Sequence, residues 1–164
     1  MTVTHVHKDP DALTMVITAE LEAPVERAWQ LWADPRQLER WWGPPGYPAT
    51  FVEHDLRVGG RAVYYMTSPE GERHYGWWEF LAVDPPRRLE VHDGFADDAG
   101  RPNYDLGVGR MVITLAERAG RTEMVITSHF PTPEAMEEML AMGQEEGMVQ
   151  AIGQIEGILA GSAS

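Results

Sequence analysis

Side chains that could act as acids, bases, nucleophiles or metal ligands are scattered along this sequence. None of the six histidines falls in an H-E-x-x-H or similar ligand spacing. The chain has no cysteine, and its serines lie outside any G-x-S-x-G frame, so thiolate chemistry, Cys-ligated zinc and a nucleophile elbow are excluded. The sequence therefore predicts no catalytic residue, no metal ion and no cofactor.

Two pairs of polar residues nevertheless have positions from which they could meet a bound molecule. His92 and Asp93 come at the end of a predicted strand, before the turn-type stretch GFADDAGRP, where either could offer a polar contact to a ligand. Glu145 and Glu146 most simply lie on the solvated face of the last predicted helix. If one of them turned inward, burial would raise its pKa and make it a general acid–base candidate.

Two pairs of adjacent tryptophans are candidates for binding. Neighbouring side chains diverge by about 100° on a helix and about 180° on a strand, so the members of a pair cannot both enter one ordinary core face. We expect one of Trp41 and Trp42 to pack in the core and the other to lie at a cavity mouth. The alternative is that both indoles pack between the two short helices and the last helix. Of Trp77 and Trp78, the inward-facing one is a pocket candidate.

These residues belong to a chain whose hydrophobic period changes from segment to segment. ALTMVITAEL has the pattern of a strand, whereas PVERAWQLW and DPRQLERWW have helical spacing, the second with Asp34 as N-cap and Pro35 at its first position. Connections of turn type then separate six strand-like runs, namely ATFVEHDL, RAVYYMTS, HYGWWEFLAV, RRLEVHDG, GRMVITLAER and TEMVITSHF. Because parallel pairs need crossovers of about a dozen residues, connections this short predict an antiparallel sheet.

The last apolar segment is predicted to be one helix from Pro133 to Leu159, with Thr132 as its N-cap. Its apolar residues form one stripe, which must cover the sheet. A second stripe contains Gly143 and Gly147, and each glycine costs about 1 kcal/mol relative to alanine in a helix interior. Two explanations stay open: the helix backbone packs closely on the sheet there, or the missing side chains leave a volume for another molecule.

Together these elements form the helix-grip architecture. This is an α+β fold in which a curved antiparallel sheet wraps around a long C-terminal helix, with two short helices after the first strand. Strand alternation gives a wall of aromatic and methionine side chains, which suits apolar ligands of varied shape, although an ordinary packed core is the alternative. The residues predicted to line the cavity are Trp41, Trp42, Tyr47, Tyr64, Met66, Trp78, Phe80, His92, Phe95, Met111, Ile113, Met139, Gly143 and Gly147.

Length and charge limit the domain organisation and the partners. The 164 residues suit one domain, which we place at 13–160 between an N-terminal tail (1–12) and a C-terminal tail (161–164). The formal charge of −13 repels phosphate backbones, and no Lys/Arg cluster reverses it, so no nucleic acid partner is expected. No segment approaches about 18 consecutive apolar residues, so we expect no membrane span and a cytoplasmic location.

Several stretches carry a resemblance to a known family: LEAPVERAWQLWADPRQLERWWGP, DLRVGG, VDPPRRLEV, GFADDAGRP and MGQEEGMVQAIGQIEGIL. They resemble the START-like (SRPBCC) superfamily, and specifically the group named after the activator of heat-shock protein 90 ATPase. The resemblance runs from about Thr14 to Leu159, with the motifs in family order. It implies the START-like fold, also called birch-pollen-allergen-like, with a hydrophobic cavity between the concave sheet and the last helix. In many relatives this cavity receives a lipid-like or aromatic molecule.

Three functions therefore stay open. We rank first the binding of a small hydrophobic, aromatic or lipid-like molecule in the cavity. The second is a co-chaperone-like stress protein that interacts with a heat-shock chaperone, which only the family name suggests. The third is a cavity enzyme of the polyketide cyclase or dehydratase type, because some START-like relatives are such enzymes. A homodimer is a further partner arrangement to be tested.

Overall fold

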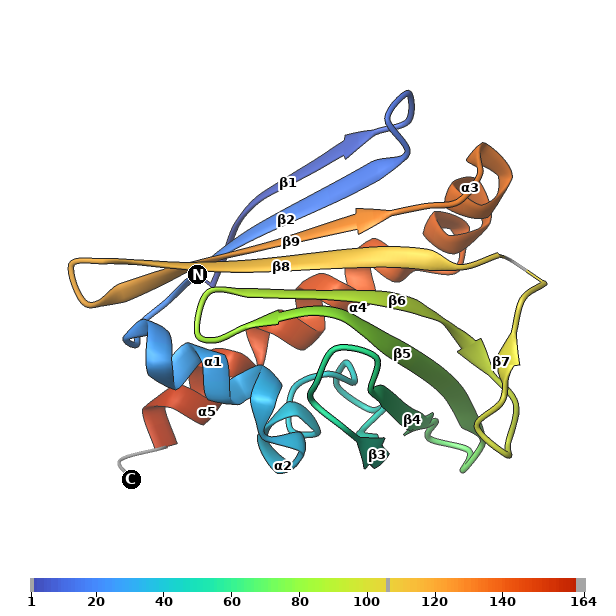
Figure 1. The fold of residues 1–164 in the computed structure, drawn as a ribbon, viewed down its shortest axis with the longest axis horizontal. Coiled ribbons are helices and arrows are strands. Elements are labelled where there is room, and N and C mark those ends of the chain that lie inside the picture. Colours follow the sequence, from blue (N-terminus) through green and yellow to red (C-terminus); the bar gives the residue numbers. More distant parts are fainter. Residues whose placement is uncertain (1, 106, 162–164) are drawn as a thin grey trace.

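The computed structural model describes residues 2–105 and 107–161, and one antiparallel sheet dominates it (Figure 1). The strands are β1 (Val3–Asp9), β2 (Thr14–Leu21), β3 (Ala49–His54), β4 (Arg61–Thr67), β5 (Arg73–Asp84), β6 (Arg88–Ala96), β7 (Pro102–Asn103), β8 (Gly109–Arg118) and β9 (Arg121–His129). They are ordered β1-β2-β9-β8-β6-β5-β4-β3, with β7 paired to β6. The predicted antiparallel pairing is confirmed at every strand pair described.

The helices lie together on one side of this curved sheet (Figure 1). They are α1 (Val25–Ala33), α2 (Pro35–Leu38), α3 (Pro133–Ala141), α4 (Gln144–Gly153) and α5 (Ile155–Gly161). The predicted caps are present, since Asp34 accepts a hydrogen bond from the backbone of Arg36 at the start of α2, and Thr132 accepts one from Ala135 at the start of α3. The α+β helix-grip fold predicted from the sequence is confirmed.

The N-terminal segment corrects one sequence expectation. Residues 1–12 were expected to form a tail, but Val3–Asp9 forms the edge strand β1, which pairs along β2. Val3 and Val6 are half-buried against the core, whereas His5 and His7 are exposed. The half-buried positions of this edge strand repeat every third residue, with a shift of register between Val3 and His5, so the sequence shows no period-2 pattern there. As a result α1 and α2 follow the second strand and not the first. The predicted C-terminal tail covers residues 161–164, of which 162–164 lie outside the described residues.

The C-terminal helix is also different from its prediction, because it consists of three consecutive helices. At the junction of α3 and α4, Gly143 adopts φ +88° and ψ +24°, a left-handed conformation that glycine takes without steric cost. A second junction follows at Gln154, between α4 and α5. The apolar stripe continues across both junctions, and for this reason the periodicity predicted one uninterrupted helix.

A cluster of aromatic rings fixes α1 and α2 against the concave face of the sheet. The ring centroid of Trp32 lies 4.8 Å from that of Trp41 and 6.2 Å from that of Trp78. The Trp41 indole N–H donates a hydrogen bond to the Leu31 carbonyl at 2.9 Å. From the C-cap of α4, Gln154 Nε2 donates to the Gly43 carbonyl at 2.7 Å, which connects the C-terminal helices to the loop after α2.

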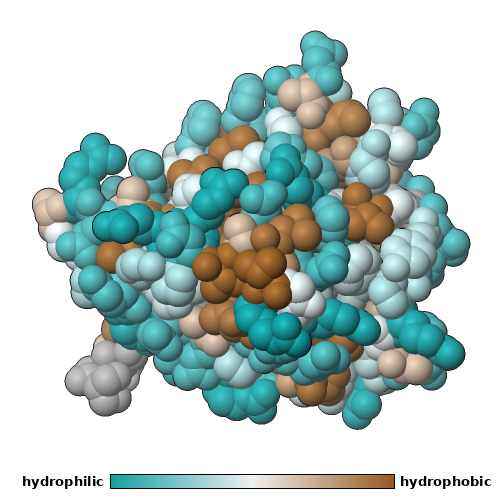
Figure 2. Space-filling view, viewed as in Figure 1, coloured by the Kyte–Doolittle hydropathy of each residue, from teal (hydrophilic) through white to brown (hydrophobic). Residues whose placement is uncertain are grey.

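The surface in Figure 2 carries separate hydrophobic patches surrounded by hydrophilic side chains, as on most folded domains. The large hydrophobic side chains exposed in the described parts of the chain are Tyr47, Val52, Val58, Phe95, Tyr104 and Met142. Within the described ranges, no helix is long and apolar enough to cross a membrane.

Candidate ligand-binding cavity

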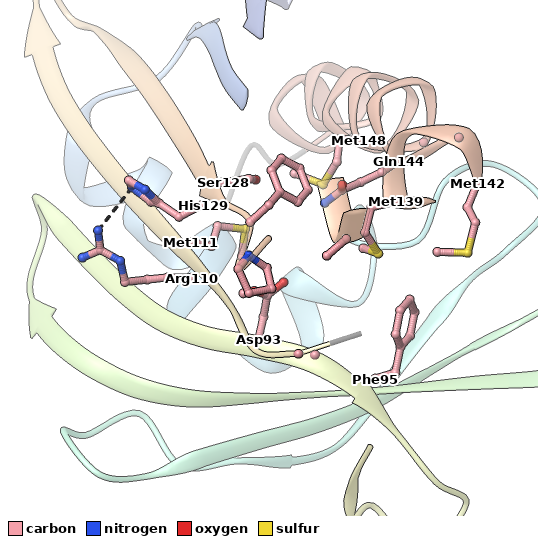
Figure 3. Close-up of a pocket in the computed structure, with 18 of the residues that line it drawn as sticks. Asp93, Phe95, Arg110, Met111, Ser128, His129, Met139, Met142, Gln144 and Met148 are labelled. Atoms are coloured by element: carbon pink, nitrogen blue, oxygen red, sulfur yellow. Dashed lines mark hydrogen bonds between the residues drawn. The ribbon is translucent and has the colours of Figure 1, made fainter. Parts of the chain in front are cut away.

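A cavity of about 340 Å³ lies between the sheet and helices α3 and α4 (Figure 3). Side chains of β4, β6, β8 and β9 form one wall, and α3, α4 and the loop after α2 form the other. In Figure 3, Met139, Gln144 and Met148 extend from the helices toward Met111 and Ser128 on the strands. The cavity therefore occupies the position between sheet and C-terminal helix that the sequence predicted.

Strand alternation places the sheet wall. Tyr64 and Met66 project from the same face of β4, and Met111 projects from β8 beside its register partner Ser128 on β9. Across the β4–β5 pair, Gly76 lies opposite Tyr64, and a Cβ at Gly76 would lie 2.4 Å from Cζ of that ring. Glycine is required at this position because the Tyr64 ring lies directly over the backbone.

The helical wall contains methionines and glycines. A Cβ built at Gly147 would meet no heavy atom within 4 Å, so the explanation that the helix backbone packs closely on the sheet there is wrong. The missing side chain leaves open space that forms part of the cavity. Phe95 and Met142 line the same side of the cavity in the view of Figure 3, and they are 39% and 57% exposed, which marks its mouth.

Trp42 separates the cavity from the aromatic core. It is only 6% exposed, with its ring centroid 4.9 Å from that of Trp78 and 6.1 Å from that of Tyr64. Trp42 lines the cavity, whereas Trp41 is fully buried in the core behind it. In the second pair, Trp78 is the inward-facing residue, and Trp77 packs on the opposite face of the sheet near Tyr104. Strand alternation divides Trp77 and Trp78 between the two faces of the sheet. Trp41 and Trp42 lie in the turn after α2, and both rings pack against Trp32 in the core, so only the cavity lining distinguishes them.

Asp93 supplies the ionisable carboxyl group of the cavity wall. It lies on the concave side of β6, opposite its register partner Gly109 on β8. A Cβ built on Gly109 would lie 2.7 Å from Asp93 Oδ1, so the carboxylate sits directly over this glycine. Burial raises the pKa of Asp93 from 3.8 to about 6. Burial also raises the pKa of Tyr64 far above its usual range, and the negative charge of Asp93 adds to this effect. The Tyr64 hydroxyl therefore stays protonated at neutral pH.

The basic residues nearby direct their charges away from the interior. Arg110 and His129 contact the edge of the cavity, but Figure 3 shows both side chains pointing away from the methionines, with Nη2 and Nε2 3.4 Å apart. The Arg110 guanidinium donates to the Glu90 carboxylate at 2.6 Å. Burial, together with the charge of Arg110, lowers the pKa of His129. His92 lies on the same outer face, 3.4 Å from a carboxylate oxygen of Glu79.

The predicted residues divide into two groups. Those that line the cavity are Trp42, Tyr64, Met66, Phe95, Met111, Met139, Gly143 and Gly147. Outside its lining are Trp41, Tyr47, Trp78, Phe80, His92 and Ile113. Trp78, Phe80 and Ile113 face the correct side of the sheet but lie deeper in the packed core, Tyr47 is exposed in a loop, and His92 faces outward. Contact of any of these residues with a ligand stays a prediction.

Several lining residues were absent from the prediction. Ser128 could have been found, because it continues the alternation of Met124 and Ile126 on the buried face of β9. Met148 belongs to the apolar stripe of the last helix, but nothing in the sequence distinguishes it from core residues. Gln144 had no signal, since its position depends on the break at Gly143. Among the residues that the structure describes, no group of three His, Cys, Asp or Glu side chains could hold a metal ion.

Comparison with known proteins places the chain in a family. Protein Ms6760 from Mycobacterium smegmatis is 49% identical, with a TM-score of 0.90 over 99% of this chain and 98% of that one. A protein from Arthrobacter aurescens is 50% identical, with a TM-score of 0.93 over 99% and 95%. DynU16, described as a putative protein in the dynemicin biosynthetic locus, is 18% identical with a TM-score of 0.64 over 90% of this chain and 47% of that one, and shares the fold alone.

No curated protein matches the sequence. The family described as activator of Hsp90 ATPase homolog 1-like protein matches residues 22–160. These residues contain the two short helices, the concave sheet wall and the C-terminal helices except the last residue of α5, so the match spans every element that surrounds the cavity. The chain belongs to the activator of Hsp90 ATPase homolog 1-like family.

Proposed function

We propose that this protein binds one small hydrophobic molecule, aromatic or lipid-like, in the cavity between the sheet and helices α3 and α4. The observation that carries the proposal is the open volume of about 340 Å³ beside Gly147, among aromatic and methionine side chains. Small-molecule sites are commonly apolar hollows of about 300–1,000 Å³ with a few polar groups. Methionines suit such a site because their flexible side chains adapt to ligands of different shapes.

The chemistry of the lining favours binding over catalysis. Asp93 is the one carboxyl group among the lining residues that the structure describes, and no second ionised group faces it from across the cavity. A cyclase or dehydratase would need a proton donor and acceptor placed together around the substrate. A chaperone partner has weaker support, because only the family description suggests it.

The test uses N-phenyl-1-naphthylamine, a neutral apolar fluorophore, with two matched glycine variants of α4. Gly147 and Gly153 both face open space, but only Gly147 lines the cavity. We expect one probe per chain, quenching of tryptophan emission through Trp42, and a loss of affinity of about tenfold or more in Gly147→Leu, because the added side chain fills the site.

Gly153→Leu should bind the probe as the unchanged protein does. Both variants should keep the circular dichroism spectrum of the fold. Equal binding by Gly147→Leu and Gly153→Leu would place the probe on the surface and refute the proposal, as would the failure of the unchanged protein to bind the probe at all.

A further inference from the structure

The buried polar groups around the cavity do not satisfy one another. Gln144 Oε1, an acceptor, is inaccessible to solvent and has no hydrogen-bond partner among the described residues. The Trp42 indole nitrogen, a donor, is equally inaccessible; the Tyr64 side chain lies beside it but makes no hydrogen bond of ordinary geometry with it. Asp93 adds an acceptor carboxylate on the opposite wall, and within the described part of the chain no other side chain donates a hydrogen bond to it. Polar groups left unpaired in an apolar site are costly, so these three positions favour a partner that can donate and accept hydrogen bonds.

The charge pattern narrows the chemistry of that partner. The Arg110 guanidinium is held by Glu90, and His92 lies beside Glu79, both on the outer face of the sheet. Tyr64, the other ionisable residue on the inner wall, is neutral because burial raises its pKa. The inner wall therefore presents one half-buried carboxyl group, and the described basic side chains nearest to it, His92 and Arg110, bond to carboxylates on the outer face and do not enter the cavity. Carboxylates brought into it would be repelled by ionised Asp93 and would themselves supply only acceptors.

We propose that the cavity selects molecules whose apolar or aromatic body carries a hydroxyl group, which donates a hydrogen bond to Asp93, over carboxylates of the same size. This inference rests on the proposed function and names the ligand class of that site. A hydroxyl group can donate a hydrogen bond, so it supplies the donor that the Asp93 carboxylate can accept, which a carboxylate ligand cannot do. A hydrocarbon body of the same shape would supply no donor, and the Asp93 carboxylate would keep only the hydrogen bond from its own backbone N–H.

Three probes that share one skeleton test this selection: 4-biphenylmethanol, 4-methylbiphenyl and biphenyl-4-carboxylate. Each displaces N-phenyl-1-naphthylamine from the full chain at pH 7.5, and its dissociation constant is measured. The alcohol should bind about tenfold tighter than the hydrocarbon, since hydrogen bonds to charged groups are strong when desolvated. Charge repulsion at Asp93 should make the carboxylate at least about tenfold weaker than the alcohol.

Two substitutions of Asp93 separate its charge from its hydrogen bond. Asp93→Asn keeps an acceptor but removes the charge, so the preference for the alcohol over the hydrocarbon should remain while the carboxylate gains about tenfold. Asp93→Leu removes the acceptor, so the alcohol and the hydrocarbon should bind within about twofold of each other. Asp98→Asn, which changes an exposed carboxylate outside the cavity, should reproduce the unchanged protein.

The inference is overturned if the unchanged protein binds biphenyl-4-carboxylate as tightly as the alcohol, or if the ranking of the three probes is the same in Asp93→Asn and Asp93→Leu as in the unchanged chain. In both cases one-to-one binding of N-phenyl-1-naphthylamine, lost in Gly147→Leu, would leave the proposed function intact. If the fluorophore itself does not bind, the proposed function fails, and this inference fails with it.

Discussion

The two ends of the space between the sheet and the helices are filled in opposite ways. At the end covered by α1 and α2, the buried indoles of Trp32, Trp41 and Trp78 pack edge to face or tilted, and Trp41 also has its N–H bonded to a carbonyl. At the end covered by α3 and the start of α4, methionines and two glycines leave about 340 Å³ open. One continuous sheet therefore supports a rigid core and a hollow.

We expect the aromatic end to contribute most of the stability and the open end to bind the ligand. Large aromatic side chains dominate the energetics of a core, because each buries a large area and allows few alternative packings. Methionine and glycine fill less volume and specify less, so the helical wall can adjust to an occupant without disturbing the aromatic end. Trp42 belongs to both regions, since it contacts the aromatic core and lines the cavity. Binding should therefore be visible in tryptophan fluorescence.

The largest effect is expected at the filled end. Trp41→Ala should lower the free energy of unfolding by about 3–5 kcal/mol, because it leaves a cavity in the packed core and removes the hydrogen bond to Leu31. Met142→Ala, at the exposed mouth of the cavity, should stay within about 0.5 kcal/mol of the unchanged protein. Urea denaturation of both variants measures the contrast. Similar losses in the two would remove the distinction between the two ends.

Sequence reasoning predicted which face each strand residue takes, but not how deep it lies. Alternation correctly put Tyr64, Trp78 and Met111 on the concave side, because the side-chain period of a strand is fixed. Whether such a residue meets the cavity or the core depends on which helix covers it. That covering is set by the helix break at Gly143 and by the contact of Gln154 with the loop after α2.

The segments that the sequence misassigned had competing signals. The edge strand β1 has two exposed residues between each pair of half-buried ones, so its sequence lacks the period of a strand and resembles a polar tail. The three C-terminal helices share an apolar stripe that passes through both junctions, so periodicity alone cannot show a break. A glycine within a helical pattern is compatible with both a continuous helix and a left-handed junction. The backbone angles of Gly143 distinguish these two possibilities.

The next effect concerns Asp93 and the pH dependence of stability. Its pKa is raised from 3.8 to about 6 in the folded protein, so between these values the folded state binds more protons than the unfolded state. The free energy of unfolding contributed by this group therefore falls as pH rises from about 4 to about 6, and at pH 7.5 the ionised carboxylate costs up to roughly 3 kcal/mol.

Asp93→Asn should remove that cost. The variant is expected to be more stable than the unchanged protein at pH 7.5 and equally stable near pH 4, as followed by thermal denaturation across this range. Tyr64 is neutral throughout, and the Arg110 guanidinium is held by Glu90 on the outer side of the sheet. The charge of His92 attracts the Asp93 carboxylate and offsets part of the effect of burial on its pKa, so Asp93→Asn removes the net cost that remains. Asp98→Asn, at an exposed site, should show no such difference. Destabilisation by Asp93→Asn at pH 7.5 would contradict the raised pKa.

The smallest effect, and the one that most directly tests the hollow end, compares two glycines that line it. Gly147 has helical backbone angles and open space beyond its Cα, so Gly147→Ala should raise the free energy of unfolding by up to about 1 kcal/mol. Gly143 has φ +88°, so Gly143→Ala should instead lower it by about 1–2 kcal/mol. Thermal denaturation beside binding of N-phenyl-1-naphthylamine measures both. Because one methyl group occupies little of about 340 Å³, Gly147→Ala should still bind the fluorophore. A loss of stability in Gly147→Ala would show that the helix backbone meets the sheet after all, and that the glycines of this wall serve packing instead of a ligand.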